Sequence, residues 1–303
     1  MIDYVKVKFI LEATCDIVLP RYKGSTFRGA FGWQFKKITC VLKSRESCDG
    51  CLLRSSCFYF NIFETYVSDK PLLKSGISIP HPYILVPPLE EKRVYEPGSQ
   101  FEFELIVIGR FVDALPYFVF TFEELGKKGL GKAKGKFIIK DILQNGVTIY
   151  QDNKLNFKKE TFNLDYSTEK TPKSIEIKTL TPVRLFKKGK PVFQPTFKDF
   201  FMAALRRCEL LMYYYGSTKL DEILDVKQLI AECGNIEILK PEFNWYHWER
   251  YSNRQKRKIS LSGIMGSFFI TNLHSDLYKI LWFGEVFHIG KNTAFGLGKY
   301  EIL

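Results

Sequence analysis

Residues His288–Leu303 read HIGKNTAFGLGKYEIL, a glycine-rich loop followed by a short strand. Gly290, Gly296 and Gly298 can adopt positive φ and let another backbone come close, which an ordinary loop of this length does not need. Two lysines lie beside them, so that backbone N–H groups and ammonium charges together would suit a phosphodiester. Because Gly-Leu-Gly also closes plain turns, the segment alone predicts either a phosphate contact or a tight structural turn.

The first half of the chain carries a similar loop at 129–136, GLGKAKGK. Apolar and polar residues alternate at 5–11 and 101–107, which is the period of half-buried strands. Each of these strands is followed by apolar residues at helical spacing. The elements are strands at 5–11, 81–88, 101–107 and 137–139, with helices at 25–38 and 112–125. Their order, strand, helix, strand, strand, helix, loop, strand, is that of a ferredoxin-like βαββαβ unit.

The same order returns in the second half, which indicates an internal duplication. Thr196 can cap a long helix there, and Gly263 and Gly266 predict a bend in a strand. The elements are an extended pair at 175–186, helices at 196–212, 220–231 and 273–281, strands at 236–251 and 258–270, and the closing loop with its strand.

The sequence therefore predicts an α+β fold of two tandem ferredoxin-like (RRM-like) βαββαβ domains, each with a glycine-rich loop before its fourth strand. The first domain spans 1–150 and holds a cysteine-rich insertion at about 40–66. A polar segment at 151–172 is expected to be a linker, and the second domain spans 173–303.

Composition points to a globular protein with a polyanionic partner. Among 303 residues, 46% are hydrophobic and 26% are charged, which excludes a disordered chain. The formal net charge of +12 favours nucleic acid as the partner. No apolar run reaches membrane-spanning length and Met1-Ile2-Asp3-Tyr4 does not resemble a secretion signal, so we expect a cytoplasmic protein without membrane contact.

The insertion contains four cysteines within 18 residues, two of them in a Cys-x-x-Cys motif. Thiolates at such spacing can converge tetrahedrally on zinc, so we predict a structural zinc site. An iron–sulfur cluster and four unliganded thiols are the alternatives, whereas disulfides do not suit a cytosolic protein. The predicted ligands are Cys40, Cys48, Cys51 and Cys57; Cys15, Cys208 and Cys233 are expected in the core.

The run 245–258, WYHWERYSNRQKRK, mixes aromatic rings with guanidinium and ammonium groups. Rings can stack on unpaired bases while the cations hold phosphates, so RNA contact is predicted for Arg250, Arg254, Lys256 and Arg257. The alternative is a sheet face with aromatic residues in the core and a solvated hairpin tip.

Several motifs in this order resemble one family. They are GSTFRGAFG at 24–32, the four cysteines, RYSNRQ at 250–255, and HIGK through GLG at 288–298. Together they look like the RAMP-superfamily CRISPR endoribonuclease that cuts precursor crRNA, the sixth Cas family. The resemblance implies two RRM-like domains, a repeat-RNA substrate, and cleavage without a catalytic metal that leaves 5′-hydroxyl and 2′,3′-cyclic phosphate ends.

Such cleavage needs proton transfer, for which histidine is suited near neutral pH. Many family members have a histidine in the first helix, but this sequence has none between Pro20 and Cys40. His288 matches the residue that precedes the loop in similar sequences, Lys291 follows it, and His247 lies in the aromatic run. These three are the predicted catalytic residues, and His81 and His274 rank lower. The predicted RNA-binding residues are Tyr22, Lys23, Arg28, Lys132, Lys134, Arg250, Arg254, Lys256, Arg257, Gly290, Gly296, Gly298 and Lys299.

Two other functions remain open at this point. One is a non-catalytic crRNA-binding RAMP subunit of a CRISPR effector complex, which would share the loops but need no proton carrier. The other is a zinc-stabilised RNA-binding adaptor. The expected partners are CRISPR repeat RNA and subunits of an effector complex, and a homodimer is an open alternative.

Overall fold

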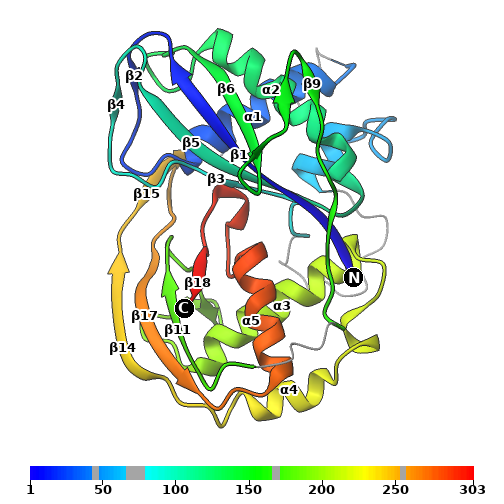
Figure 1. The fold of residues 1–303 in the computed structure, drawn as a ribbon, viewed down its shortest axis with the longest axis vertical. Helices are drawn as coiled ribbons and strands as arrows, with labels where there is room; N and C mark the ends of the chain where they lie inside the picture. Colours follow the sequence, from blue (N-terminus) through cyan, green and yellow to red (C-terminus); the bar gives the residue numbers. More distant parts are fainter. Residues whose placement is uncertain (43–47, 66–78, 166–170, 253–256) are drawn as a thin grey trace. The chain divides into compact units, whose positions relative to one another are not determined.

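The computed structural model describes residues 1–42, 48–65, 79–165, 171–252 and 257–303 (Figure 1). The chain divides into two compact units, one formed by Asp3–Glu160 and the other by Thr161–Leu303 together with Met1–Ile2. The division falls within the polar segment expected as a linker. Part of that segment is regular structure, because β8 (Tyr150–Gln151) and β9 (Lys154–Leu155) pair as a short hairpin and β10 covers Glu160–Phe162.

The Asp3–Glu160 unit is built on one antiparallel sheet with the strand order β3-β5-β1-β6-β7. Both of its long helices contribute side chains to a shared core. Its main elements are β1 (Ile2–Ala13), α1 (Gly24–Thr39), β3 (Tyr83–Val86), β5 (Gln100–Ile108), α2 (Leu115–Lys128), β6 (Phe137–Gln144) and β7 (Val147–Thr148). The short strands β2 (Ile17–Val18) and β4 (Val94–Tyr95) pair with each other, a π-helical turn covers Phe60–Glu64, and a 3-10 turn covers Gly109–Ala114.

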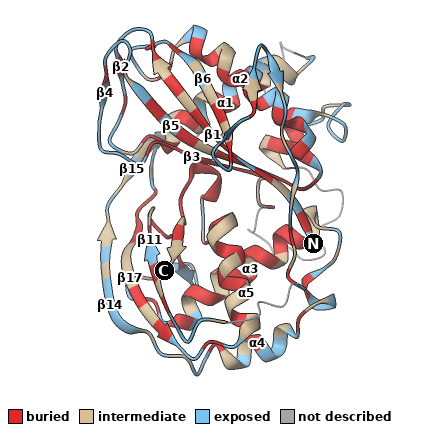
Figure 2. Cartoon of the chain, viewed as in Figure 1, coloured by how far each residue is buried: buried red, intermediate tan, exposed pale blue. Residues whose placement is uncertain are grey.

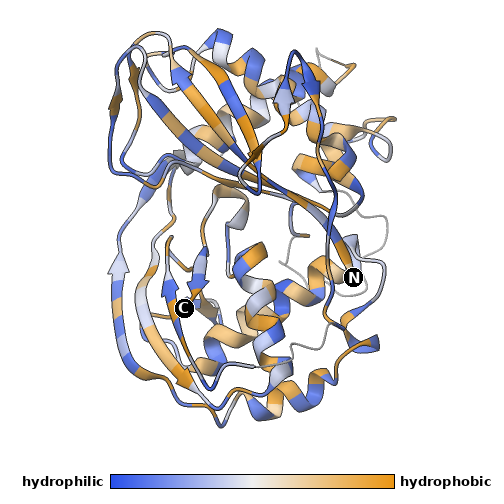
Figure 3. Ribbon diagram, in the orientation of Figure 1, coloured by the Kyte–Doolittle hydropathy of each residue, from blue (hydrophilic) through white to orange (hydrophobic). Residues whose placement is uncertain are grey.

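Aromatic side chains fill this core. Phe9 of β1 stacks on Phe103 of β5 with ring centres 4.5 Å apart, and Phe31 of α1 stacks on Phe118 of α2 at 5.1 Å. Figure 2 shows buried residues alternating along the strands, and Figure 3 shows the matching alternation of hydropathy. Burial of each such ring contributes about 1.5–3 kcal/mol. The period-two strands and the helical stripe predicted for this half are therefore confirmed.

A glycine explains how α1 meets the cysteine-rich insertion. A Cβ on Gly32 would lie 2.1 Å from the ring of Phe63, which belongs to the π-helical turn. The ring occupies the space that a larger residue at this position would need. The close packing at this glycine is thus made by an aromatic side chain.

The Thr161–Leu303 unit repeats the same pattern, with an antiparallel sheet in the order β14-β17-β11-β18. Helices α3 and α5 pack against each other beside this sheet (Figure 1). The elements are β11 (Ser174–Thr179), β12 (Phe186–Lys187), β13 (Lys190–Pro191), α3 (Phe197–Tyr215), α4 (Val226–Glu232), β14 (Leu239–Tyr246), β15 (Glu249–Ser252), β16 (Arg257–Ser260), β17 (Gly263–Thr271), α5 (Ser275–Phe287) and β18 (Tyr300–Ile302). 3-10 turns cover Leu220–Glu222 and Thr293–Phe295.

The strand predicted at 236–251 is broken into two. β14 ends at Tyr246, and Trp248 is then held by the β16–β17 connection, since its N–H donates to the Ser262 hydroxyl at 3.0 Å and its carbonyl accepts from the Leu261 N–H at 2.8 Å. β17 runs without a break through Gly263 and Gly266, where the sequence predicts a bend. Gly266 has φ +140°, and the irregularity lies in β14, whose register with β17 shifts between Leu239 and Glu242.

No helix in the described ranges is both long enough and apolar enough to cross a lipid bilayer.

Candidate nucleic-acid interface

The glycine-rich loop of the Thr161–Leu303 unit folds back on itself after α5. The Ile289 N–H donates to the Gly298 carbonyl at 3.0 Å, and the Lys291 N–H donates to the Arg184 carbonyl at 3.1 Å. The Thr181 hydroxyl donates to the Gly296 carbonyl at 2.8 Å. The loop is therefore tied both to its own ends and to the segment that follows β11.

Its glycines are needed for close packing of the chain against itself. Gly298 has φ +77°, and a Cβ there would lie 1.8 Å from the Ile289 carbonyl oxygen. Gly290 has φ +76°, and its Cβ would lie 2.7 Å from the Arg184 carbonyl oxygen. Gly296 is buried and Lys299 is half-buried. RNA contact by these four residues stays a prediction, but the structural turn explains the glycines without it.

His288 lies inside the loop. Its side chain is 1% exposed, its φ is +56°, and its Nδ1 is 3.1 Å from the Leu297 carbonyl oxygen. Because a carbonyl only accepts hydrogen bonds, Nδ1 carries the proton and the ring holds the two sides of the loop together. Arg207 of α3 reinforces this place by donating from Nε to the Phe287 carbonyl at 3.1 Å, and burial lowers the pKa of its guanidinium to about 10.

Lys291, by contrast, is exposed at the start of the loop. Its Nζ lies 5.6 Å from the ring centre of Phe186, and the Arg184 guanidinium lies 5.5 Å from the same ring. Arg184 is fixed because its Nε donates to the Ser262 carbonyl at 3.0 Å and Nη1 donates to Asn292. Burial lowers the Arg184 pKa, but an arginine stays charged near neutral pH. Two cations thus flank one exposed aromatic ring beside the loop.

One residue of the aromatic run 245–258, Arg250, contacts the same loop. Arg250 is half-buried, with its guanidinium 4.8 Å from the ring centre of Phe295 in the loop. His247 is exposed just after β14, and its ring centre is 6.4 Å from that of Trp245. Arg254 and Lys256 lie outside the described residues, and for Arg257 only the backbone is described.

The corresponding loop of the Asp3–Glu160 unit has a different surface. Leu130 and Gly135 exchange backbone hydrogen bonds of 2.7 and 3.0 Å, and between them Lys132 and Lys134 are exposed. Gly131 packs against the Val18 carbonyl oxygen, 2.7 Å from where its Cβ would lie. This loop presents its lysines to solvent, whereas most of the loop after α5 is buried.

The start of α1 corrects one prediction. Lys23 is 0% exposed, and its Nζ donates to the carbonyls of Glu90 at 2.5 Å and Arg21 at 3.4 Å. Burial lowers the pKa of this ammonium group. Lys23 therefore fixes the chain before α1 and has no surface with which to bind RNA. Tyr22 beside it is half-buried.

His81, which the sequence ranked below two other histidines, contacts a cation on α1. Its Nε2 lies 3.0 Å from Nη2 of Arg28 on α1, and the Arg28 guanidinium lies 4.3 Å from the ring centre of Phe63. Because a guanidinium only donates, Nε2 accepts and the ring is neutral in this arrangement. Burial raises the pKa of the adjacent Tyr83 to about 12, although Arg28 acts in the opposite direction. No local pattern could have linked Arg28 to a histidine 53 positions away.

The four clustered cysteines are all half-buried. Burial raises the pKa of the Cys48 thiol, and Cys57 and Cys40 are close enough to act on it electrostatically. Across the described ranges, no group of three or more His, Cys, Asp or Glu side chains is arranged to hold a metal ion. Zinc therefore stays a prediction.

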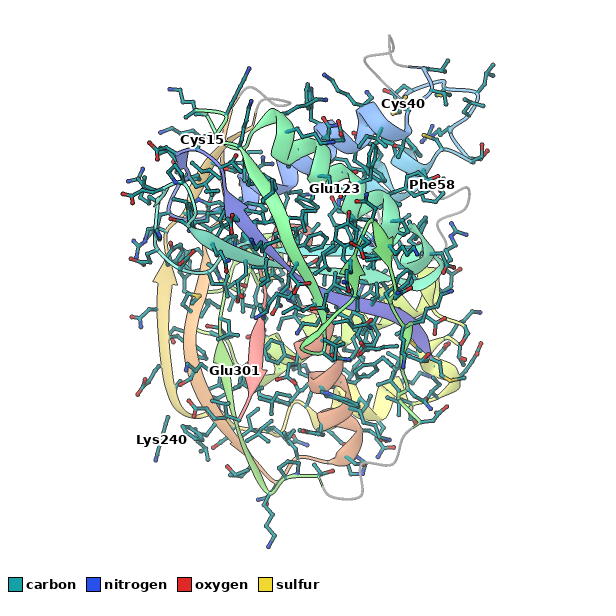
Figure 4. The ribbon with its side chains drawn as sticks, turned by 45° about the horizontal axis from the view of Figure 1, so that its top comes forward. Cys15, Cys40, Phe58, Glu123, Lys240 and Glu301 are labelled. Atoms are coloured by element: carbon teal, nitrogen blue, oxygen red, sulfur yellow. The ribbon has the colours of Figure 1, made fainter. Side chains whose placement is uncertain are left out.

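The other three cysteines were all expected in the core. Cys208 and Cys233 are buried, as expected, but Cys15 is exposed and accepts a hydrogen bond from the Lys136 N–H at 3.1 Å. Its position after β1, apart from Cys40, is labelled in Figure 4.

Comparison with known proteins gives two family matches along the chain. Residues 2–162 match the AF_1859_N N-terminal domain, and residues 177–300 match CRISPR-associated endoribonuclease Cas6. An uncharacterized protein of Archaeoglobus fulgidus is 26% identical over 298 residues, covering 94% of this chain and 92% of that protein.

Solved structures of Cas6 proteins have a similar fold. A Cas6 product complex matches with a TM-score of 0.60 at 12% identity over 99% of this chain and 100% of that one. Thermus thermophilus Cas6 matches with a TM-score of 0.57 at 11% identity, over 100% and 99% of the two chains. A chain of a partial Cas6-RT-Cas1–Cas2 complex matches with a TM-score of 0.59 at 13% identity. The match covers 100% of this chain and 46% of the chain in that complex.

Proposed function

We propose that this chain, whose residues 177–300 match CRISPR-associated endoribonuclease Cas6, cuts precursor CRISPR RNA within the repeats and releases mature crRNA. The observation that carries the proposal is the surface of the Thr161–Leu303 unit at the loop after α5. Exposed Lys291 and half-buried Arg250 contact aromatic rings there, and both cations suit an RNA phosphate. The formal net charge of +12 adds a field that attracts RNA.

The proposed reaction needs no catalytic metal. The 2′-hydroxyl of the nucleotide before the cut loses its proton and attacks the adjacent phosphorus, while the bond from phosphorus to the 5′-oxygen breaks and that oxygen gains a proton. The products are a 2′,3′-cyclic phosphate and a 5′-hydroxyl. Cationic side chains stabilise the extra negative charge on the phosphorane. Lys291 is the candidate for this role in the described part of the loop.

There are three candidates for the proton carrier. His247 is exposed and a substrate can reach it, whereas the His288 ring is 1% exposed and acts on the RNA only if the loop opens. His81 is a third, but its Nε2 accepts a hydrogen bond from Arg28, so that it can take a proton from RNA only when this contact breaks. We propose His247 with Lys291 as the pair that contacts the reacting phosphate, and His288 as the residue that holds Lys291 in place.

The test uses purified protein, excess EDTA, and repeat RNA with either a hydroxyl or a hydrogen at the 2′ position before the cut. Site-specific cleavage of the hydroxyl substrate alone, with a cyclic phosphate on the upstream product, is the expected result. Equal cleavage of both substrates would exclude attack by the 2′-hydroxyl. Tight binding without product at any protein excess would instead identify a non-catalytic crRNA-binding subunit.

That second function has specific support. The sequence lacks a histidine between Pro20 and Cys40, and the histidine best matched to the family pattern, His288, is buried. In this alternative the same surfaces bind crRNA within an effector complex.

The sequence also left a homodimer open. Light scattering of the purified protein with and without RNA measures the mass of the particle and so tests for a dimer.

We also propose that the two units are tandem ferredoxin-like domains. In each unit a βαββαβ series of main elements forms an antiparallel sheet whose outer strands are the second and fourth, β3 and β6 in one and β14 and β18 in the other, with β7 added beside β6. The cysteine-rich segment lies between α1 and β3, which is the place of an insertion.

A structural zinc ion held by the four clustered cysteines completes the proposal. Elemental analysis of the purified protein is expected to find about one zinc per chain, as a closed four-cysteine site requires. Iron would identify the cluster alternative, and the absence of both metals would leave four free thiols.

A further inference from the structure

A short hairpin beside the loop after α5 carries exposed aromatic rings. It comprises β12, β13 and their flanking residues 183–193, here called the aromatic hairpin. Phe186 is 41% exposed and Phe193 is 54% exposed. Lys187, Lys188 and Lys190 are also exposed, and the turn between the strands uses the positive φ of Lys188 and Gly189. Single exposed apolar residues are ordinary, but two rings together with three lysines make a surface of distinct chemistry.

The base of the aromatic hairpin is firmly anchored. Val183 and Ile264 of β17 exchange backbone hydrogen bonds of 2.9 Å, and the Val192 N–H donates to the Leu185 carbonyl at 3.1 Å. On the side of α3, the Lys187 ammonium donates to Asp199 at 3.0 Å. A platform held this way loses little conformational entropy when a ligand binds.

The aromatic hairpin lies near both exposed catalytic candidates, Lys291 and His247. At one end Phe186 lies 5.6 Å from the Lys291 ammonium. At the other end the Phe193 ring centre is 4.4 Å from that of Trp245, which in turn is 6.4 Å from that of His247. The aromatic hairpin thus reaches Lys291 through Phe186, and it reaches the surroundings of His247 through Phe193 and Trp245.

We propose that the aromatic hairpin is a stacking platform for unpaired nucleotides of the RNA next to the cut. Phe186 and Phe193 stack on bases, and Lys188 and Lys190 bind the phosphates between them. Base–aromatic stacking tolerates any base, because every base has a π face, so the platform positions the strand without fixing its sequence. This inference rests on the proposed RNA substrate and adds to it the single-stranded state of the segment that is bound.

The test measures the affinity of the full chain for repeat RNA by fluorescence anisotropy. Phe186→Ala and Phe193→Ala are each expected to raise Kd by about fivefold or more, and Phe186→Trp is expected to keep wild-type affinity. Phe120 of α2, 47% exposed, provides the matched control: Phe120→Ala should change Kd by less than about twofold. Because the rings are exposed, the melting temperatures of all variants should stay close to that of the wild type.

A second readout reports stacking directly. 2-Aminopurine placed in the unpaired flank of the repeat should lose fluorescence on binding the wild type, and should regain it with the Phe186→Ala, Phe193→Ala double variant. The Lys188→Glu, Lys190→Glu variant tests the same surface without altering ring packing, and it should weaken binding and reduce the salt dependence of Kd.

The outcomes separate this inference from the proposed function. Wild-type protein that neither binds nor cuts repeat RNA would overturn both. Normal RNA binding by the wild type together with unchanged affinity and unchanged quenching in the hairpin variants would overturn only the inference, and would leave the rings as a surface for a protein partner. Equal loss of affinity for the repeat and for a fully paired duplex would also overturn it, because a duplex offers no unstacked bases.

Discussion

At the scale of single residues, the two histidines predicted as catalytic have opposite surroundings. His288 is buried at positive φ with a hydrogen bond to the Leu297 carbonyl, whereas His247 is exposed. The same chemical group is therefore expected to serve stability in one position and proton transfer in the other, and substitutions can distinguish these roles.

We predict that His288→Ala lowers the free energy of unfolding by about 2–3 kcal/mol, because it removes a buried hydrogen bond and leaves a cavity. His288→Asn should restore part of this loss, since asparagine tolerates positive φ and its amide can donate. Denaturant unfolding measures both. A stable His288→Ala protein with slow cleavage would instead make His288 a proton carrier.

His247→Ala is expected to leave stability within about 0.5 kcal/mol of the wild type, as for most exposed positions. Under single turnover it should slow cleavage by at least about tenfold, because general acid–base groups contribute about 100-fold or more. His81→Ala is the comparison. If only His81→Ala slows cleavage, the proton carrier lies beside α1 and the assignment of His247 is wrong.

At the scale of elements, the glycine-rich loop shows how far the sequence could predict the site. The motifs Gly129-Leu130-Gly131-Lys132 and Gly296-Leu297-Gly298-Lys299 are identical in sequence. Both leucines are buried, but Gly131 is half-buried and Lys132 exposed, whereas Gly298 is buried and Lys299 half-buried. In the second loop the Gly298 N–H donates to the Pro182 carbonyl and the Thr181 hydroxyl donates to the Gly296 carbonyl. Those partners lie more than 100 positions away, so local sequence could predict the loop but not its burial. Strand and helix periods are local, which is why most elements were predicted correctly.

Gly298→Ala should therefore be among the most destabilising single changes in this loop. It combines positive φ, which costs an alanine about 1–2 kcal/mol, with a Cβ only 1.8 Å from the Ile289 carbonyl oxygen. Gly189 is the matched control, since its φ is +81° and nothing lies within 4 Å of its Cβ position. Thermal unfolding should show a loss of about 3 kcal/mol or more for Gly298→Ala and about 1 kcal/mol for Gly189→Ala. Similar losses would mean that the loop yields to a methyl group.

Asp199, at the start of α3, should make the free energy of unfolding depend on pH in the acid range. Burial acts to raise the pKa of Asp199, but hydrogen bonds from Lys187 and Thr196 outweigh it and lower that pKa. The stabilisation is therefore complete above the unfolded pKa of about 3.9, and it is lost as pH falls through the lower folded pKa. Asp199→Asn should reduce the free energy of unfolding near neutral pH by about 1 kcal/mol and flatten its acid dependence. If the free energy of unfolding of this variant falls at acid pH as steeply as in the wild type, Asp199 does not have this role.

At the scale of the whole molecule, the excess of 45 basic over 33 acidic residues should govern the strength of RNA binding. We predict that log Kd rises linearly with log salt concentration, with a slope of about 0.7 for each phosphate contacted on single-stranded RNA. Anisotropy titrations over about a tenfold range of salt give the slope. His288→Asn should leave it unchanged, and a slope near zero in the wild type would argue against phosphate binding.

The irregular start of β14 has a consequence for how the protein behaves in concentrated solution. β14 is an outer strand of its sheet, and outer strands can pair with strands of another molecule and aggregate. Lys240 has φ +47° and Pro241 has no N–H, so the regular ladder is interrupted where the register shifts. Lys240 also adds a charge, at the edge labelled in Figure 4. These two residues protect the open edge of the sheet, so the chain can carry an outer strand of eight residues without offering a template for fibre formation.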